Sequence, residues 1–204
     1  TVRPNHERFY FVTPEEAASV LEACPDAQWR LLFALSRYGG LRCPSEHLAL
    51  KWGDVDWDKG LLRVSSPKTE HHEGKASRLV PIYPELRPHL EESWDLAKDG
   101  TEFVINRYRS SEANLRTHLR RIIERAGLQA WPKAFQNLRS TRQTELEDEG
   151  FPSHVVCAWM GNSESVARKH YLQVTDDHHS RAIGGSPEAR KAAHHMCADD
   201  AQEI

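Results

Sequence analysis

The sequence has few cysteines and no long apolar run, and both scarcities exclude whole classes of protein. Its four cysteines (Cys24, Cys43, Cys157 and Cys197) lack the spacing of a disulfide framework or of a set of metal ligands, so we expect reduced thiols. No stretch is apolar enough to cross a bilayer, and the first residues lack the apolar segment of a secretory signal. These features predict a cytoplasmic protein with no membrane partner and no bound metal.

An excess of positive charge, the usual mark of a nucleic-acid-binding protein, is also missing. The net charge of the 204 residues is −3, and the segment 175–204 accounts for all of it, with six acidic and three basic residues. The rest is neutral overall but contains a basic stretch, 107–125. This stretch supplies the candidate DNA-binding residues Arg107, Arg109, Arg116, Arg120 and Arg121. Such segregation is compatible with one basic face, although solvated helix faces would give the same pattern.

Local sequence patterns predict a mainly helical α+β domain with a small antiparallel sheet. Thr13-Pro14-Glu15-Glu16 is a capping box with proline at the first helical position, so a helix should run to about residue 23. Short apolar segments predict strands over 61–64 and 78–82, on either side of a polar loop. Apolar periodicity predicts further helices near 26–38, 44–50, 85–97, 111–126, 134–149, 153–160 and 163–173. We expect four tryptophans to pack in the core: Trp52, Trp57, Trp94 and Trp159.

Five short motifs follow one another along these elements. Each is weak alone, but their order and spacing resemble the conserved boxes of the tyrosine recombinases, or phage integrases. The motifs are Tyr38-Gly39-Gly40-Leu41-Arg42 with Glu46; Pro67-Lys68-Thr69 before Arg78-Leu79-Val80-Pro81-Ile82; Phe135-Gln136-Asn137-Leu138-Arg139; Trp159-Met160-Gly161-Asn162; and Arg168-Lys169-His170-Tyr171. The resemblance implies the catalytic-domain fold of that family and a DNA strand-transfer activity.

The same resemblance assigns a catalytic role to most of these positions. Arg42 and Arg139 would clamp the scissile phosphate, because a guanidinium group binds phosphate through a planar fork and stays charged. Lys68 would protonate the leaving 5′ oxygen, and Tyr171 would attack phosphorus and hold the 3′ end covalently. Glu46 would support the arginines. This chemistry needs no cofactor and no metal.

Two positions depart from the family pattern, since Gln136 and Asn162 stand where the family usually has residues such as histidine. An amide can donate a hydrogen bond to phosphate but cannot exchange protons near neutral pH. The sequence therefore leaves alternatives open: a DNA-binding module of the same fold without catalysis, or a relative of type IB topoisomerases. A metal hydrolase is a further alternative, but the histidine pairs lack the spacing of metal ligands.

The resemblance also predicts the domain organisation and the partners. We expect a linker over 1–12, a tyrosine-recombinase catalytic domain over 13–175 and a C-terminal tail over 176–204 that is exchanged between subunits. The partners would be double-stranded DNA and other recombinase subunits, assembled as a tetrameric synapse at the nucleoid. The family's N-terminal DNA-clamping domain has no counterpart before Thr13, so we expect this chain to be a fragment.

Overall fold

The computed structural model describes residues 9–65, 77–110 and 113–172. The chain divides into two units, Thr1–Leu172 and Gln173–Ile204, and every described residue belongs to the first. The predicted linker, apart from its last few residues, the tail and Lys68 lie outside the described residues. No helix among the described residues is long and apolar enough to cross a membrane.

Two helices open the domain, and side-chain caps fix where each begins. Helix α1 (Pro14–Glu22) starts at the predicted capping box, in which Thr13 and Glu16 each accept a hydrogen bond from the other's backbone N–H. Helix α2 (Ala27–Arg37) is capped by Asp26, whose carboxylate accepts from the Trp29 N–H at 2.9 Å. Most of α2 is buried, so it forms the centre of the helical core.

A small antiparallel sheet follows the short helix α3 (Ser45–Ala49). Its strand order is β1-β2-β3, and Leu62 of β2 pairs with Val80 of β3. Strands β2 and β3 confirm the predicted strands, whereas β1 has only two residues and is too short to show an alternating pattern. The bounds are Trp52–Asp54 for the 3-10 helix η2, Val55–Asp56 for β1, Leu61–Ser65 for β2 and Ser77–Pro81 for β3.

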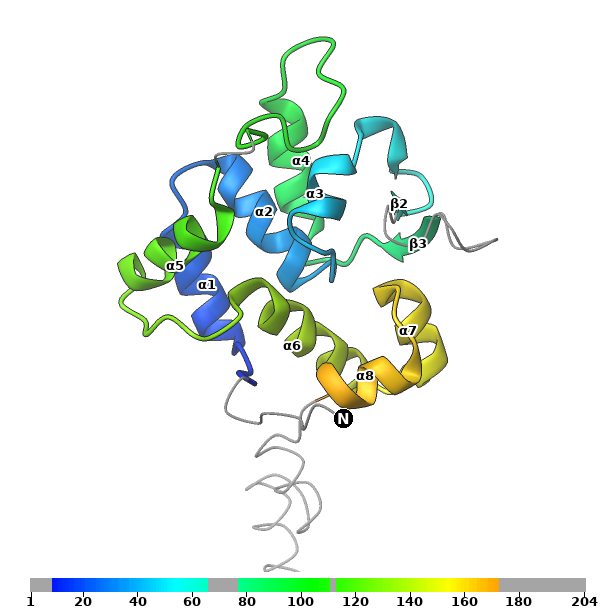
Figure 1. The fold of residues 1–204 in the computed structure, drawn as a ribbon. Coiled ribbons are helices and arrows are strands. Elements are labelled where there is room, and N and C mark those ends of the chain that lie inside the picture. Colours follow the sequence, from blue (N-terminus) through cyan, green and yellow to red (C-terminus); the bar gives the residue numbers. More distant parts are fainter. Residues whose placement is uncertain (1–8, 66–76, 111–112, 173–204) are drawn as a thin grey trace, which may run out of the picture. The chain divides into compact units, whose positions relative to one another are not determined.

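Five helices complete the described domain, and they confirm the predicted helices with shifted ends (Figure 1). The largest shift is at α5, which begins near 115 rather than 111 because Asn114 caps it: the Asn114 Oδ1 accepts from the Thr117 N–H at 3.0 Å. The bounds are Arg87–Asp95 for α4, Leu115–Arg125 for α5, Ala134–Asp148 for α6, Ser153–Met160 for α7 and Glu164–His170 for α8.

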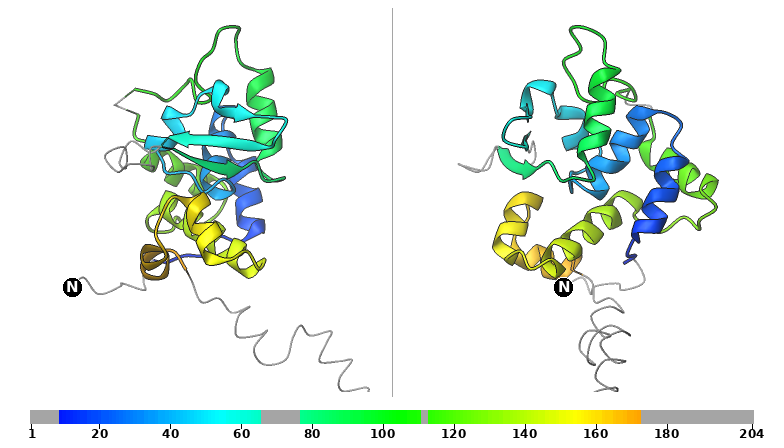
Figure 2. Two further views of the ribbon diagram at one scale, coloured as in Figure 1. Left: turned by 90° about the vertical axis from the view of Figure 1, so that its right-hand side faces the viewer. Right: turned by 180° about the vertical axis from the view of Figure 1, so that it is seen from behind.

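Helix α2 packs against α4 on one side and α6 on the other, and α7 packs against both β3 and α6. Figures 1 and 2 show β3 facing α7 across this contact. The expectation that all four tryptophans pack in the core was wrong for Trp94, which is 50% exposed. Its ring instead meets the edge of Trp52, with 5.0 Å between the ring centroids. The contacts of α7 matter most for function, because they bring distant parts of the sequence to one place.

Candidate active site

A buried carboxylate, Glu46 on α3, forms the centre of the candidate site. Its side chain is 1% exposed and accepts hydrogen bonds from two arginines. Arg78 Nη1 and Nη2 donate to the two carboxylate oxygens at 2.7 and 2.8 Å. The Arg42 Nη1 donates to Oε1 at 2.6 Å, and the Arg42 backbone N–H donates to Oε2 at 2.7 Å. Arg139 Nη1 lies 3.8 Å from Oε2, so three arginines surround Glu46.

The charges of these four side chains do not cancel. Burial alone would raise the pKa of Glu46, but hydrogen bonds and charge from Arg78, with the charges of Arg139 and Arg42, lower the pKa to about 2. Burial lowers the pKa of Arg139 to about 10, which still leaves it charged at neutral pH. Three positive charges therefore share one negative charge, and the cluster is suited to binding an anion.

The C-terminus of α7 holds the same three arginines through consecutive backbone carbonyls. Arg78 Nε donates to the carbonyl of residue 159 at 2.7 Å, Arg139 Nη2 to that of residue 160 at 3.1 Å, and Arg42 Nη2 to that of Gly161. The last carbonyls of a helix lack helical partners and carry the negative end of its dipole, so they attract cations. The cluster and the end of α7 therefore stabilise one another.

Gly161 allows the chain to turn at this point. It adopts a left-handed conformation with φ of 67°, and a Cβ there would lie 3.0 Å from the Arg78 side chain. A larger residue would carry both backbone strain and a steric conflict inside the cluster. The sequence position of Gly161 at a helix end was predicted, but its closeness to Arg78 depends on the packing of β3 against α7.

Sequence reasoning missed Arg78, which it treated only as part of a strand. The signal was present in the alternation of β3, because Arg78 lies two residues before Val80 and so shares its face of the strand. Val80 is 1% exposed, and the Arg78 side chain is 11% exposed. A cation on the inward face of a strand is unusual, and this one is held there by Glu46.

Tyr171 lies beside the cluster at the C-terminal end of α8. Its backbone N–H donates to the carbonyl of Ala167 at 2.9 Å, and its own carbonyl accepts from Ser140 Oγ. The Arg139 guanidinium carbon is 5.4 Å from the centroid of the Tyr171 ring. The structure thus brings together three of the predicted catalytic residues, Arg42, Arg139 and Tyr171, from three separate parts of the sequence.

The two predicted amides occupy different surroundings. Asn162 directly follows the α7 cap, and its Nδ2 donates to Gln143 Oε1 at 2.9 Å, while its Oδ1 is buried with no hydrogen-bond partner among the described residues. Gln136 lies in the first turn of α6 and lines a groove instead. Within the part of the chain that the structure describes, no hydrogen bond joins Gln136 to Arg42, Arg78 or Arg139.

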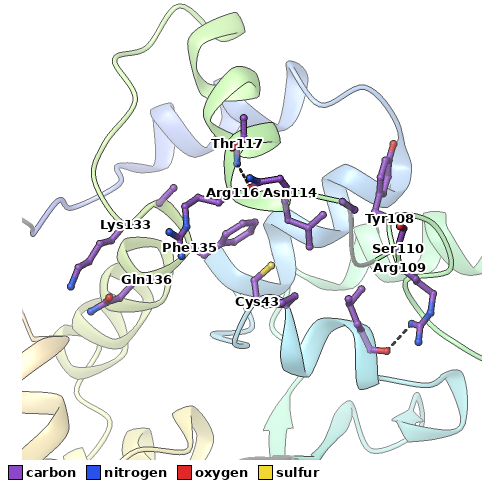
Figure 3. Close-up of a pocket in the computed structure, with 15 residues that line it drawn as sticks. Cys43, Tyr108, Arg109, Ser110, Asn114, Arg116, Thr117, Lys133, Phe135 and Gln136 are labelled. Atoms are coloured by element: carbon purple, nitrogen blue, oxygen red, sulfur yellow. Dashed lines mark hydrogen bonds between the residues drawn. The ribbon is translucent and has the colours of Figure 1, made fainter.

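The groove has a volume of about 830 Å³ and lies between the starts of α5 and α6 (Figure 3). Three cationic residues line it, and two helix N-termini open near it, so it favours anions. Figure 3 shows Arg116, Lys133 and Gln136 along one side and Arg109 at the other. The polar residues that line it include Arg109, Asn114, Arg116, Lys133 and Gln136.

The predicted DNA-binding arginines are not equivalent. Arg109 and Arg116 line the groove, and Arg109 Nη1 also donates to the carbonyl of Leu48 at 2.7 Å. Arg107 is paired with Asp26 at 2.9 Å, and Arg120 with Glu124 at 2.9 Å. Arg121 is exposed on α5. Within residues 9–65, 77–110 and 113–172 there is no group of three or more side chains able to hold a metal ion.

The family model described as the phage integrase family matches residues 10–178. The chain belongs to the phage integrase family. The tyrosine recombinase XerA of Thermococcus kodakarensis is 30% identical over 179 residues, covering 84% of this chain and 60% of XerA. This integrase-family chain therefore spans less than two thirds of the length of that relative.

Solved structures confirm the fold predicted for an integrase-family catalytic domain. A crystal structure of XerA recombinase matches with a TM-score of 0.69 at 22% identity, over 85% of this chain and 63% of that one. A lambda integrase dimer bound to a COC′ core site matches with a TM-score of 0.62 at 20% identity, over 80% of this chain and 48% of that one. The mainly helical α+β architecture with a small antiparallel sheet was thus predicted correctly.

Proposed function

We propose that this domain catalyses site-specific DNA recombination by breaking and rejoining DNA through a 3′-phosphotyrosyl intermediate at Tyr171. The observation that carries the proposal is the arginine cluster with its excess positive charge, beside which the Tyr171 ring lies 5.4 Å from Arg139. A nucleophile next to fixed cations is what exchange at a phosphodiester requires. Family membership supports the same activity.

In the proposed reaction, Arg42 and Arg139 bind the non-bridging oxygens of the scissile phosphate. The Tyr171 oxygen loses its proton to water and forms a bond to phosphorus, and the bond from phosphorus to the 5′ oxygen breaks. The leaving oxygen takes a proton, for which Lys68 is the donor by resemblance. A 5′ hydroxyl from a second strand then attacks the phosphotyrosyl bond, which releases Tyr171 and reseals the DNA. Glu46 remains ionised throughout and holds the arginines in place.

The proposed partners are double-stranded DNA and further recombinase subunits, assembled as a tetramer on the DNA at the nucleoid. The groove between α5 and α6 supports a contact with the DNA backbone, because Arg109, Arg116 and Lys133 line it. The matched lambda integrase structure is a dimer bound to its core site, which supports the involvement of more than one subunit.

The test is covalent capture on a pool of nicked duplexes with a randomised core sequence, which removes the need to know the target site. We expect the wild type to form protein–DNA adducts, and Tyr171→Phe to bind the same DNA with unchanged affinity but form none. An adduct that persists in Tyr171→Phe would show that another residue is the nucleophile. If the wild type binds DNA but forms no adduct, the proposal that this domain catalyses recombination is wrong.

That last result would favour the second candidate, a DNA-binding module that keeps the fold without the reaction. The observation behind it is the pair of amides at Gln136 and Asn162, neither of which exchanges protons near neutral pH. The two candidates predict equal DNA affinity and opposite outcomes in the capture experiment, so one measurement separates them.

A further inference from the structure

Gln143 on α6 is a buried polar residue to which no role has so far been assigned. Its side chain has no exposed surface, and it lies four residues after Arg139, so the two share one face of the helix. Its Oε1 accepts from Asn162 Nδ2 at 2.9 Å, and its Nε2 faces Cys157 Sγ at 3.9 Å. Gln143 thus joins α6 to the residue that follows the end of α7.

This pair of amides leaves one atom unsatisfied. Asn162 Oδ1 is buried with no donor among the residues that the structure describes, which is unfavourable in a protein interior. Each amide has a second orientation that exchanges its oxygen and nitrogen. If both exchange, Gln143 Nε2 donates to Asn162 Oδ1, and the Cys157 thiol donates weakly to Gln143 Oε1. The Asn162 Nδ2 then takes the place of the unsatisfied oxygen and has an N–H free to donate.

We propose that Gln143 is a positioning residue for strand cleavage, because it holds Asn162 in the orientation that donates a hydrogen bond to the scissile phosphate. Asn162 directly follows Gly161, whose carbonyl accepts from Arg42, so the backbone of Asn162 borders the arginine cluster. The inference rests on the proposed recombination activity and adds a residue to it. A phosphate favours the exchanged arrangement because an anion attracts a donor rather than an acceptor.

A double-mutant cycle with Gln143→Met and Asn162→Ala tests the proposal in single-turnover cleavage at saturating DNA. Methionine keeps the length of the side chain but neither holds nor orients an amide. We expect Gln143→Met to slow cleavage about tenfold in the wild-type background, the size of one hydrogen bond. In the Asn162→Ala background the same change should have almost no effect, because there is no longer an amide to position.

A second variant, Gln143→Glu, gives a pH dependence of cleavage that a purely structural role of Gln143 would not produce. In Gln143→Glu, the introduced carboxyl can donate to Asn162 Oδ1 only while it is protonated. When ionised it can only accept, which fixes Asn162 in the orientation whose Nδ2 donates to residue 143. We therefore expect cleavage by Gln143→Glu to fall as the pH rises through the pKa of that carboxyl, whereas Gln143→Met shows no such step.

The control is Gln28→Met, the same change at a buried glutamine that bonds to backbone groups of residues 104 and 106 instead. It should lower thermal stability without slowing the cleavage step. If Gln143→Met slows cleavage equally in both Asn162 backgrounds, or if the Gln143→Glu profile is flat, Gln143 does not position Asn162. If the wild type forms no adduct, the proposed function itself fails and this inference fails with it.

Discussion

The arginine cluster and the basic stretch 107–125 are both cationic, but they differ in how firmly their charges are held. In the cluster, the side chains of Arg139 and Arg78 are 3% and 11% exposed and are hydrogen-bonded to a carboxylate or to backbone carbonyls. On the basic stretch, the side chains of Arg107 and Arg120 are 62% and 70% exposed, and their partners are surface acids. Buried, fixed charges suit transition-state stabilisation, whereas exposed charges suit attraction of DNA and are screened by salt.

The largest contrast is expected from Arg139→Lys. Lysine keeps the charge but cannot reach the carbonyls of residues 40 and 160 while also forking around a phosphate. We expect single-turnover cleavage to fall roughly 10²–10³-fold, the range for loss of one preorganised donor, with little change in DNA affinity. Arg120→Lys is the matched change on the exposed side and should leave the rate unaltered. Equal losses from both variants would remove the distinction between the two regions.

The next largest effect is expected from Glu46→Gln, which should lower the stability of the folded domain. The pKa of Glu46 is lowered to about 2 in the folded state, so its ionisation stabilises the fold above its ordinary pKa of 4.5, and this contribution is lost as the pH falls toward 2. A shift of this size corresponds to about 3 kcal/mol. We expect Glu46→Gln to lower the free energy of unfolding by about this amount at neutral pH. Between pH 5 and 2, the free energy of unfolding of this variant should fall less steeply than that of the wild type.

Chemical denaturation across that pH range provides the measurement. The control is Glu92→Gln, which removes a surface carboxylate that is 37% exposed and paired with Arg30. A surface ion pair typically contributes at most about 1 kcal/mol, so this variant should change little. A decline in Glu46→Gln as steep as that of the wild type would mean that other carboxylates cause the acid sensitivity.

A smaller effect is expected from Arg116→Gln in the groove. Each phosphate contact adds about 0.9 to the slope of log affinity against log salt, so losing one should flatten the slope by that amount. Arg87→Gln on α4 is the control, since Arg87 is paired with Glu91 and does not line the groove. Binding titrations from low to high salt measure both. An unchanged slope in Arg116→Gln would show that the groove does not contact DNA.

The smallest effect is expected from pH: the cleavage rate, plotted against pH, should show no inflection near pH 6.5. His47 is buried next to Glu46 in sequence, and burial lowers its pKa to about 3, so it stays neutral in the assay range. Gln136 and Asn162 do not titrate there either. A rate profile measured between pH 5 and 8 checks this. A step that disappears in His170→Gln would assign an acid–base role to His170 instead.

Local rules account for most of what the sequence predicted. The capping box at Thr13, the short apolar segments of β2 and β3 and the periodicity of the helices depend on neighbours in the chain, so each was found in nearly the right place. Helix ends were less accurate, as at Asn114, because a cap depends on a single side-chain contact. Recognition of Arg42, Arg139 and Tyr171 depended on resemblance, and the structure then placed them together.

The contacts that the sequence did not predict depend on packing between distant parts of the chain. Arg78 joins the cluster because β3 lies against α7, and the bond between Gln143 and Asn162 forms because α6 lies against α7. Neither pair is close in sequence, so no local pattern shows that its two members meet. The division of the basic stretch into groove residues and paired surface residues is likewise a result of tertiary structure.

The three consecutive carbonyls at the end of α7 link three arginines from separate elements to a single helix. Trp159, Met160 and Gly161 each hold an arginine from a different element, so if α7 detaches, all three arginines lose an anchor at once. A nascent or partly unfolded chain would then carry Tyr171 without an ordered arginine cluster beside it. For a protein proposed to cut DNA, this arrangement would make the proposed cleavage depend on the docking of α7.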